Sequence, residues 1–260
     1  MIDSIIITNQ SNGNSVVLDR DSSDYLIDDD GLDWGKVSSS FSTVGTLDNY
    51  GSTITAIDTQ QPRPINIIGW VAGTESQMAK KKSRLSKVIT PNDTIRIEIP
   101  RKSDPTKIYF IDTIMNDSLH YDNTYRANNE VMCRFSLSLI APYPYFEYPR
   151  REIFSTGGTL INNGDIPVGL YAEFDSSGEG SNFTISNGHQ IAIFEALRSG
   201  NFKINTQYGA RSVLLSSQKA FKYMSPNYGW VFVPQGTCSV ETDGELILQF
   251  NEAYTVLEDC

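Results

Sequence analysis

The chain has 260 residues, 39% hydrophobic and 20% charged, a composition typical of an ordinary folded protein with room for two domains. Its 31 acidic and 21 basic side chains give a formal net charge of -10, which disfavours general affinity for DNA or RNA because such a surface repels phosphates on average. No stretch of about 18 apolar residues occurs, so the sequence predicts no membrane-spanning helix.

The cysteines and the N-terminus give no sign of secretion. Cys133, Cys238 and Cys260 show no CxxC spacing and have no histidine nearby that would complete a metal site. Their odd number favours reduced thiols and synthesis in a reducing cytosol. The apolar run Ile5–Ile7 lacks a basic start and a cleavage site, so we expect a first strand there rather than a signal peptide.

The first part of the chain predicts short strands. Brief β-branched runs lie between turn signals such as Asn12-Gly13 and Asp30-Gly31. The predicted strands are Val16–Leu18, Tyr25–Ile27, Ile54–Ile57 and the stronger Ile65–Val71.

One helix is expected over residues 75–90. Thr74 and Gln77 have the spacing of a capping box, and Thr90-Pro91 ends the segment. Met78, Leu85 and Ile89 share one face of a 3.6-residue period. The opposite face is basic and consists of Lys80, Lys81, Lys82, Arg84 and Lys87. A solvated outer face is the favoured interpretation; an ion-paired contact of Lys80, Lys81, Lys82 and Arg84 with an acidic neighbouring subunit is the alternative.

Three alternating segments follow the helix. Thr94–Ile99 has period two, and so have Lys107–Ile114 and Val131–Ile140. We expect the last two to pair with each other across the polar stretch 116–129. In Val131–Ile140 the residues predicted to face one side are Cys133, Phe135, Leu137 and Leu139.

A proline-rich aromatic segment then divides the chain. Pro142, Pro144 and Pro149 cannot supply ladder amides, and each favours an extended residue before it. The sequence therefore predicts a β domain with one helix over residues 1–141, a stiff linker over 142–149 and a second domain over 150–260.

The second half predicts a β-sandwich without a helix. Short strands recur at roughly ten-residue spacing, among them Gln190–Phe194 and Trp230–Val233. Between the strands Thr159–Ile161 and Val168–Phe174 we expect a tight type I′ turn with positive φ at its central residues. The residues of this turn are Asn163, Gly164, Asp165 and the following Pro167.

Several of these segments, in this order, are similar to siphophage distal tail proteins. The strand Ile65–Gly73 before a Lys-rich helix, the Ala141–Phe146 junction, the run Asn162–Val168 and the strand Phe183–Asn187 resemble the corresponding parts of that family. The likeness covers most of the chain in order and spacing.

This resemblance implies a structural hub in the tail tip or baseplate of a bacteriophage virion. It implies an N-terminal domain that assembles into a hexameric ring, which continues the tail tube and lets DNA through. A galectin-like C-terminal β-sandwich would dock baseplate or receptor-binding proteins and the tail-associated tip protein. The protein would be made in the cytoplasm of the bacterial host, and its acidic charge suits a channel that does not grip DNA.

No pattern of residues indicates an enzyme, a metal site or a cofactor site. His120 and His189 are isolated, and no catalytic signature contains them. The run Asp28–Asp33 fails as a calcium loop, because Val37 stands where a bidentate Glu is needed, and a solvated turn is favoured over another calcium site. The galectin sugar pocket is not evident either, since His189 is followed by Gln190 and Ile191.

A carbohydrate-binding module for a bacterial surface, with exposed Tyr and Trp side chains on which sugar rings stack, stays open as the alternative function.

Overall fold

The structure, a computed structural model, describes residues 4–21, 24–45, 52–127, 130–207, 209–226 and 229–257. Its described residues are mainly β with one α-helix, which confirms the predicted fold class. The chain forms two compact units: Met1–Phe146 with Thr255–Cys260, and Glu147–Tyr254. The division falls inside the segment predicted as a linker. The return of the last residues to the first unit was not predicted.

The first unit is built on a sheet that closes on itself. Its strands follow the order β8-β7-β1-β2-β3-β6-β10-β9, and β10 also pairs with β8. The strands are β1 (Ser4–Asn9), β2 (Ser15–Asp19), β3 (Tyr25–Asp33), β6 (Arg63–Gly73), β7 (Ile95–Arg101), β8 (Asp104–Met115), β9 (His120–Ala127) and β10 (Glu130–Ala141). Alternate residues are fully buried in several of these strands, as in Ile5 and Ile7 of β1 and Ile95, Ile97 and Ile99 of β7.

The predicted pairing of Lys107–Ile114 with Val131–Ile140 is wrong for most of its length. β10 pairs with β6 from Val131 to Ala141 and with β9 on its other side, and it meets β8 only at Leu139 and Ile140. The reason is that the polar stretch after β8 contains β9 rather than a loop. The predicted inward face of β10 is confirmed, because Cys133, Phe135, Leu137 and Leu139 are all buried.

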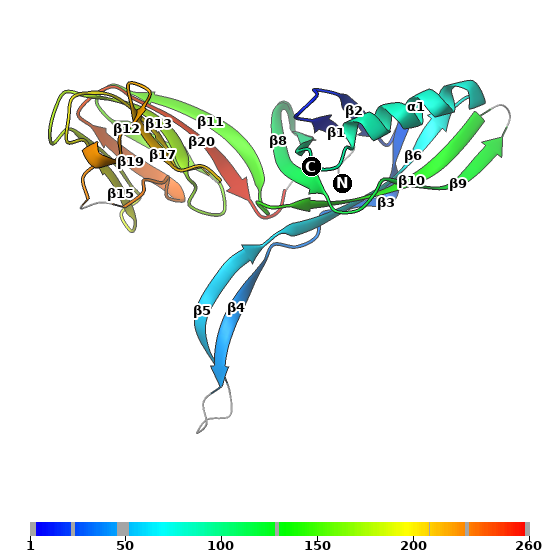
Figure 1. Cartoon of the computed structure of the whole chain (residues 1–260), viewed down its shortest axis with the longest axis horizontal. Coiled ribbons are helices and arrows are strands. Elements are labelled where there is room, and N and C mark those ends of the chain that lie inside the picture. Colours follow the sequence, from blue (N-terminus) through cyan, green and yellow to red (C-terminus); the bar gives the residue numbers. More distant parts are fainter. Residues whose placement is uncertain are drawn as a thin grey trace. The chain divides into compact units, whose positions relative to one another are not determined.

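Helix α1 (Glu75–Val88) lies against β1, β2, β6 and β10 (Figure 1). Met78, Leu85 and Ile89 are buried as predicted, together with Val88. At the helix start the amide of Thr74 donates to Oε1 of Gln77 over 3.2 Å, as expected for the capping box. Burial of this one apolar stripe is what holds α1 on the sheet.

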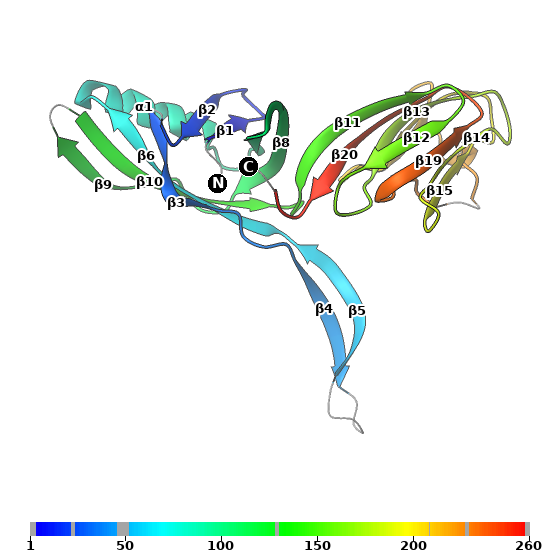
Figure 2. The ribbon, with the colours of Figure 1, turned by 180° about the vertical axis from the view of Figure 1, so that it is seen from behind.

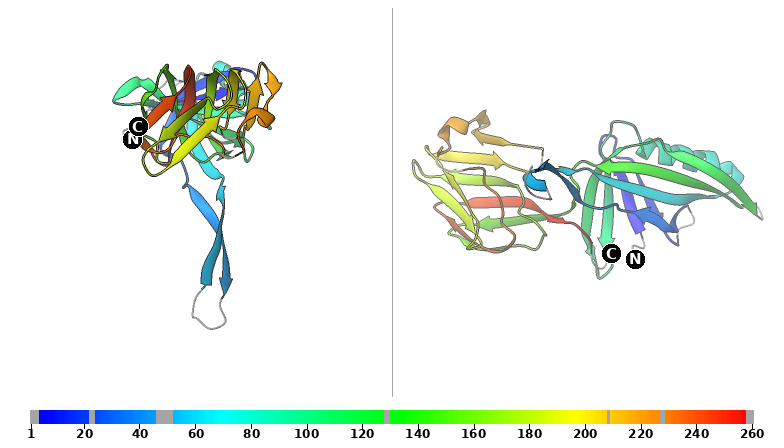
Figure 3. Two further views of the ribbon diagram at one scale, coloured as in Figure 1. Left: turned by 90° about the vertical axis from the view of Figure 1, so that its left-hand side faces the viewer. Right: turned by 90° about the horizontal axis from the view of Figure 1, so that it is seen from below.

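A separate hairpin belongs to the first unit. β4 (Ser38–Gly45) and β5 (Ser52–Gln61) pair with each other, from Ser38 opposite Gln61 to Gly45 opposite Ser52, and with no other described strand. Figures 1 and 3 draw the two strands extending away from the closed sheet of this unit. Because the predicted strand Ile54–Ile57 is part of β5, that prediction is confirmed, whereas the length of the hairpin was not foreseen.

The second unit consists of two facing sheets, as predicted. One has the order β18-β17-β16-β13-β20-β11 and the other β12-β19-β14-β15 (Figure 2). The strands are β11 (Phe146–Phe154), β12 (Gly158–Asn162), β13 (Leu170–Ser176), β14 (Asn182–Ser186), β15 (Ile191–Glu195), β16 (Gly200–Asn205), β17 (Ser212–Leu215), β18 (Gln218–Lys219), β19 (Gly236–Thr242) and β20 (Leu246–Tyr254). The predicted strand Trp230–Val233 is reduced to one bridge between Val233 and Val168.

Four phenylalanines join the two sheets of the second unit. Phe174 of β13 and Phe202 of β16 come from one sheet, and Phe183 of β14 and Phe194 of β15 come from the other. Their ring centroids lie 5.4 Å apart for Phe174–Phe183 and for Phe194–Phe202, and all four side chains are at most 2% exposed. Such edge-to-face packing of large rings stabilises a sandwich core beyond its buried area.

Candidate functional site

The basic face of α1 is only partly solvated. Lys80, Arg84 and Lys87 are exposed, whereas Lys81 and Lys82 are half-buried. The ammonium of Lys82 lies 4.8 Å from the ring centroid of Tyr121, a cation–π contact within the unit. The interpretation as a solvated face therefore fits three of these cations and does not fit the other two.

The ammonium group of Lys81 forms an ion pair and a hydrogen bond within its own chain. Its Nζ lies 2.6 Å from Oδ1 of Asp24 and donates to the carbonyl of Ala72 over 2.5 Å. The main-chain oxygen of Lys81 accepts from the hydroxyl of Tyr25 at 3.0 Å, and burial raises the pKa of that tyrosine. Lys81 thus ties α1 to β3 and β6 and has little freedom to serve a neighbouring subunit.

A surface hollow of about 730 Å³ opens beside this tie, between α1 and the adjacent strands. Charges of both signs line it: Asp24, Glu130, Lys80, Lys81 and Arg84. Of its three cations, Lys80 and Arg84 are exposed, and the Arg84 guanidinium donates to the carbonyl of Ser15 at 3.3 Å. Among the cations that line the hollow, these two are available for an acidic partner.

The C-terminal end of α1 is held by Asn9, a residue that the sequence analysis missed. Asn9 is fully buried; its Nδ2 donates to the carbonyl of Val88 at 3.1 Å, and to Oδ2 of Asp93 at 3.0 Å. Hydrogen bonds from the Thr90, Asn9 and Ser11 side chains lower the pKa of the Asp93 carboxyl. A helix end leaves carbonyls without partners, and a buried amide at the end of β1 satisfies one of them.

A second surface lies on the outer side of β6, β9 and β10. Trp70 of β6 stands opposite Arg134 of β10, and Met132 of β10 stands opposite Tyr125 of β9. The rings of Trp70 and Tyr125 lie 5.4 Å apart, and Tyr125 is 56% exposed. Exposed aromatic groups on a rigid sheet are typical of protein–protein contact surfaces. Sequence reasoning did not single out this surface because its residues come from three strands.

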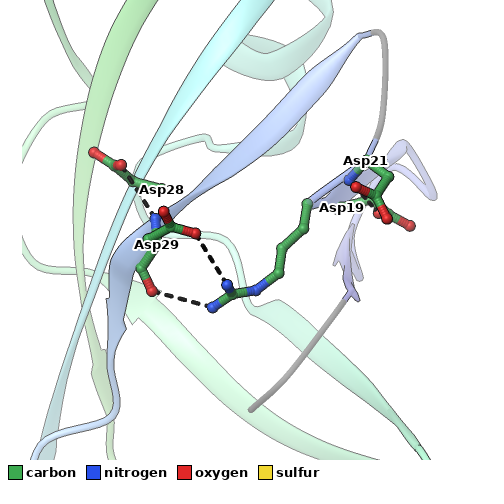
Figure 4. A network of polar contacts seen from close by, with 5 residues as sticks. Asp19, Asp21, Asp28 and Asp29 are labelled. Atoms are coloured by element: carbon green, nitrogen blue, oxygen red, sulfur yellow. Dashed lines mark hydrogen bonds and ion pairs between the residues drawn. The ribbon is translucent and has the colours of Figure 1, made fainter.

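The acidic run of β3 does not form a converging set of carboxylates. Arg20 donates to Oδ1 and to the carbonyl of Asp29, each at 3.1 Å, while Oδ1 of Asp28 accepts from the Asp29 amide (Figure 4). Asp19 and Asp21 lie together on the other side of the same view, joined by a 2.8 Å hydrogen bond from the Asp21 amide to the Asp19 carboxylate. Within the described residues, no group of three metal-binding side chains gathers anywhere.

Arg63 forms a hydrogen bond with the proline-rich segment, where the chain leaves the first unit. β11 begins at Phe146, so Pro142 and Pro144 precede this strand and Pro149 lies inside it. Arg63 is 3% exposed; its Nη1 donates to the carbonyls of Pro144 at 3.1 Å and Thr255 at 3.0 Å. Burial lowers the pKa of Arg63, which Asp33 partly opposes.

Arg63 also forms a hydrogen bond with Trp34 and a cation–π contact with Phe146. Its Nε donates to the carbonyl of Trp34 at 2.5 Å, and its guanidinium lies 4.6 Å from the ring centroid of Phe146. One side chain therefore holds both the outgoing segment at Pro144 and the returning segment at Thr255. The sequence offered no signal for this, since Arg63 has partners 28 to 192 residues away.

The predicted type I′ turn at Asn163-Gly164 is wrong. Neither residue has positive φ, and β12 and β13 belong to different sheets, so the segment crosses between sheets instead of closing a hairpin. Side chains hold it in place: Nδ2 of Asn162 donates to the Ile166 carbonyl at 3.1 Å, and Oε1 of the buried Glu252 accepts from the Asn163 amide at 3.1 Å.

Gly164 nevertheless has a structural requirement. The amide of Asp165 donates to the carbonyl of Ala253 at 2.7 Å, which draws this segment onto β20. A Cβ at Gly164 would lie 2.6 Å from the nitrogen and 2.8 Å from the oxygen of Ala253. Close backbone approach, rather than a left-handed conformation, is what requires glycine here. Pro167 lies between this contact and β13.

Among the described residues, the histidines and cysteines form no cluster that could hold a metal ion. His120 is in β9, with Nε2 2.8 Å from Oδ1 of Asp122, and its side chain is 67% exposed, while His189 is exposed in a loop. Cys133 and Cys238 are buried free thiols, and Cys260 lies outside the described residues. No helix in the described part of the chain is long and apolar enough to cross a membrane.

Neither a protein-family model nor a curated protein matches the sequence. Among solved structures, the chain is similar to SPP1 Dit (gp 19.1), which is described as a paradigm of the hub adsorption apparatus in phages that infect Gram-positive bacteria. The match has a TM-score of 0.64 at 11% identity and covers 96% of this chain and 98% of SPP1 Dit. The chain has the fold of SPP1 Dit.

This likeness confirms, at the level of the fold, the resemblance to phage distal tail proteins that the sequence indicated. It extends over nearly the full length of both chains, so it includes described residues of both units. At 11% identity the likeness rests on topology and packing rather than on shared side chains.

Proposed function

We propose that this protein is the structural, non-enzymatic hub of a bacteriophage tail tip or baseplate. The observation that carries the proposal is the likeness to SPP1 Dit over 96% of the chain, because a match of that extent includes both units. In this role the protein works through its surfaces, needs no cofactor and belongs to the tail of the virion.

The proposed assembly is a hexameric ring of the first units that joins the tail tube to the host-adhesion apparatus. Closed rings need a heterologous contact that returns on itself, so each subunit must present two complementary surfaces. Subunits of formal charge -10 repel one another, and a local patch of opposite sign offsets this repulsion. Lys80 and Arg84 of α1 supply such a patch for an acidic neighbour.

The galectin-like second unit would dock baseplate, receptor-binding or tip proteins, and DNA would pass through the ring. An acidic subunit suits this passage, since each phosphate that a channel neutralises would add affinity and slow the movement of DNA.

Native mass spectrometry and negative-stain electron microscopy of the full chain test the ring, alone and with tail tube protein. The expected species has six times the 29.0 kDa mass of one chain and an open centre. Lys80→Glu should shift the population toward smaller species by at least about tenfold, whereas Lys219→Glu, the same charge change in the second unit, should leave it unchanged.

A strict monomer that also fails to enter a ring with tube protein would contradict the proposal. That outcome would favour the carbohydrate-binding module that the sequence leaves open. An intact ring in both variants would support the hub function and would show that the ring does not depend on a contact of Lys80.

A further inference from the structure

A small hollow of about 290 Å³ in the second unit is framed by three segments that the fold fixes in place. The loop after β15 supplies Arg198, β18 supplies Lys219, and the 3₁₀ turn η1 (Phe221–Tyr223) supplies Lys222 and Tyr223. The amide of Leu197 donates to the carbonyl of Tyr223 at 2.8 Å, which joins the loop to the turn. We call this hollow, lined by Arg198, Lys219, Lys222 and Tyr223, the basic hollow.

A two-residue hairpin sets the position of Lys219. Ser216 and Ser217 have φ values of 48° and 68°, and β17 and β18 pair on either side of them with Leu214 opposite Lys219. This is the left-handed backbone of a tight hairpin turn, which fixes the register of the strands it joins. Lys219 therefore stands on a defined backbone at the edge of the sheet.

The basic hollow has an uncompensated positive charge. Its lining contains three cations and no Asp or Glu. Throughout the part of the chain that the structure describes, Arg198, Lys219 and Lys222 form no ion pair with a carboxylate. In a chain of net charge -10, three neighbouring cations without acidic partners are not explained by surface solubility alone.

The hydroxyl of Tyr223 lies close to two of the cations that line the basic hollow. Nη1 of Arg198 donates to its hydroxyl at 3.2 Å, and the Lys222 ammonium lies 4.9 Å from its ring centroid. Hydrogen bonds from Lys222 and Arg198 lower the pKa of Tyr223, because both favour a negative oxygen at that point. Another anionic oxygen placed beside the same two cations would be favoured for the same reason.

The number and kind of cations indicate which anion fits. A phosphate group carries between one and two negative charges near neutral pH and offers several acceptor oxygens, whereas a carboxylate offers one charge and two oxygens. Arginine forks and lysine ammonium groups are the usual partners of phosphate oxygens in proteins. Three cations around a small hollow match phosphate better than carboxylate.

Phe221 lies in the sequence between Ala220 and Lys222, both of which line the basic hollow. Phe221 is 45% exposed, and its ring centroid lies 5.7 Å from that of Trp230. This exposed ring is the reason to compare a phosphate ester that carries an aromatic group with inorganic phosphate.

We propose that the basic hollow is a binding site for a phosphate group. This site is independent of the ring and of the hub function. Arg198, Lys219 and Lys222 contact the phosphate oxygens.

The test is a titration of the full chain with inorganic phosphate, with phenyl phosphate and with acetate, at constant ionic strength. Phosphorus NMR follows the first two ligands, and isothermal calorimetry follows all three. Both phosphates should bind with millimolar or better dissociation constants, and acetate should bind at least about tenfold more weakly. Tighter binding of phenyl phosphate than of inorganic phosphate would identify a phosphate ester as the preferred form; equal binding would identify the phosphate group alone.

Two single variants place the binding in the basic hollow. Lys219→Gln and Lys222→Gln change exposed side chains, so both should fold, with melting temperatures near that of the parent, and each should weaken phosphate binding several-fold. Lys203→Gln is the matched control, since Lys203 is an exposed lysine of β16 in the same unit that does not line the hollow. The proposal is overturned if the parent chain does not bind phosphate, if neither variant weakens binding, if Lys203→Gln weakens it equally, or if acetate binds as well as phosphate.

Discussion

Gly164 illustrates how a residue can be required for a reason that its local sequence does not indicate. The Asn163-Gly164 pair suggested a hairpin turn, yet the glycine has ordinary φ and is needed because segment 162–166 lies directly on the backbone of Ala253. The obstacle to a side chain is therefore main chain, which cannot move aside as a flexible side chain could.

We expect Gly164→Ala to lower the free energy of unfolding by about 1–3 kcal/mol, because a methyl group would overpack against Ala253. Denaturant melts of the full chain measure this change. Gly178→Ala is the matched control, since a Cβ at Gly178 would meet no atom within 4 Å and the φ of this glycine is not positive. Equal midpoints for the two variants would show that the segment yields without cost.

Arg63 is the second residue whose role depends on distant parts of the chain. We expect Arg63→Met to lower the free energy of unfolding by about 2–3 kcal/mol, because the buried carbonyl of Pro144 and the partly buried carbonyls of Trp34 and Thr255 lose their donor. Thermal and denaturant melts give the value. Arg63→Lys should recover part of the loss, since one ammonium cannot reach all the positions of a guanidinium fork.

The control for Arg63 is Arg126→Met, which removes an exposed ion pair with Glu75. Exposed pairs contribute at most about 1 kcal/mol, so this variant should remain close to the parent. If Arg63→Met were no more destabilising than Arg126→Met, the junction would not depend on the buried guanidinium.

At the scale of elements, β11 decides where the second unit begins. The strand runs from Phe146 to Phe154 and pairs with β20, so a boundary at residue 150 would divide it. We expect the fragment Glu147–Tyr254 to fold alone with one cooperative transition, since it has its own phenylalanine core.

A second fragment, residues 150–260, provides the comparison. It lacks the first part of β11 and carries the end of the chain that belongs to the first unit, so its denaturation midpoint should be lower. Circular dichroism during thermal and urea unfolding distinguishes the two. Absence of a sigmoidal transition in both fragments would mean that the second unit depends on the first.

At the scale of the whole molecule, the chain is expected to be stable without metal. In β3 the carboxylates of Asp28 and Asp29 are held by Arg134, Arg20 and a backbone amide rather than aimed at a common point. EDTA should therefore leave the melting temperature within about 1 °C of its value without chelator, because a ligand stabilises a protein only by binding its native state. Scanning calorimetry with and without about 5 mM added Ca²⁺ completes the test. A rise of several degrees with Ca²⁺ would reveal a site that the described residues do not show.

The sequence by itself determined the features that depend on local periodicity. Alternation of apolar residues specified β7 and β10 and the buried face of β10, the β-branched run Ile65–Val71 specified β6, and the 3.6-residue period with Thr74 and Gln77 specified α1. The spacing of short strands specified the sandwich class of the second unit. These patterns are readable because neighbouring residues in a strand or helix share one backbone geometry.

Tertiary structure decided everything that joins residues far apart in the chain. The place of β9 beside β10, the role of Arg63, the Asn9 contact with the end of α1 and the basic hollow all combine segments whose separation no local pattern encodes. Gly164 shows the limit most directly, since the same dipeptide allows a hairpin turn or a close crossing. Only the presence of Ala253 on β20, 89 residues after Gly164, decides between them, because steric exclusion acts through space and not along the sequence.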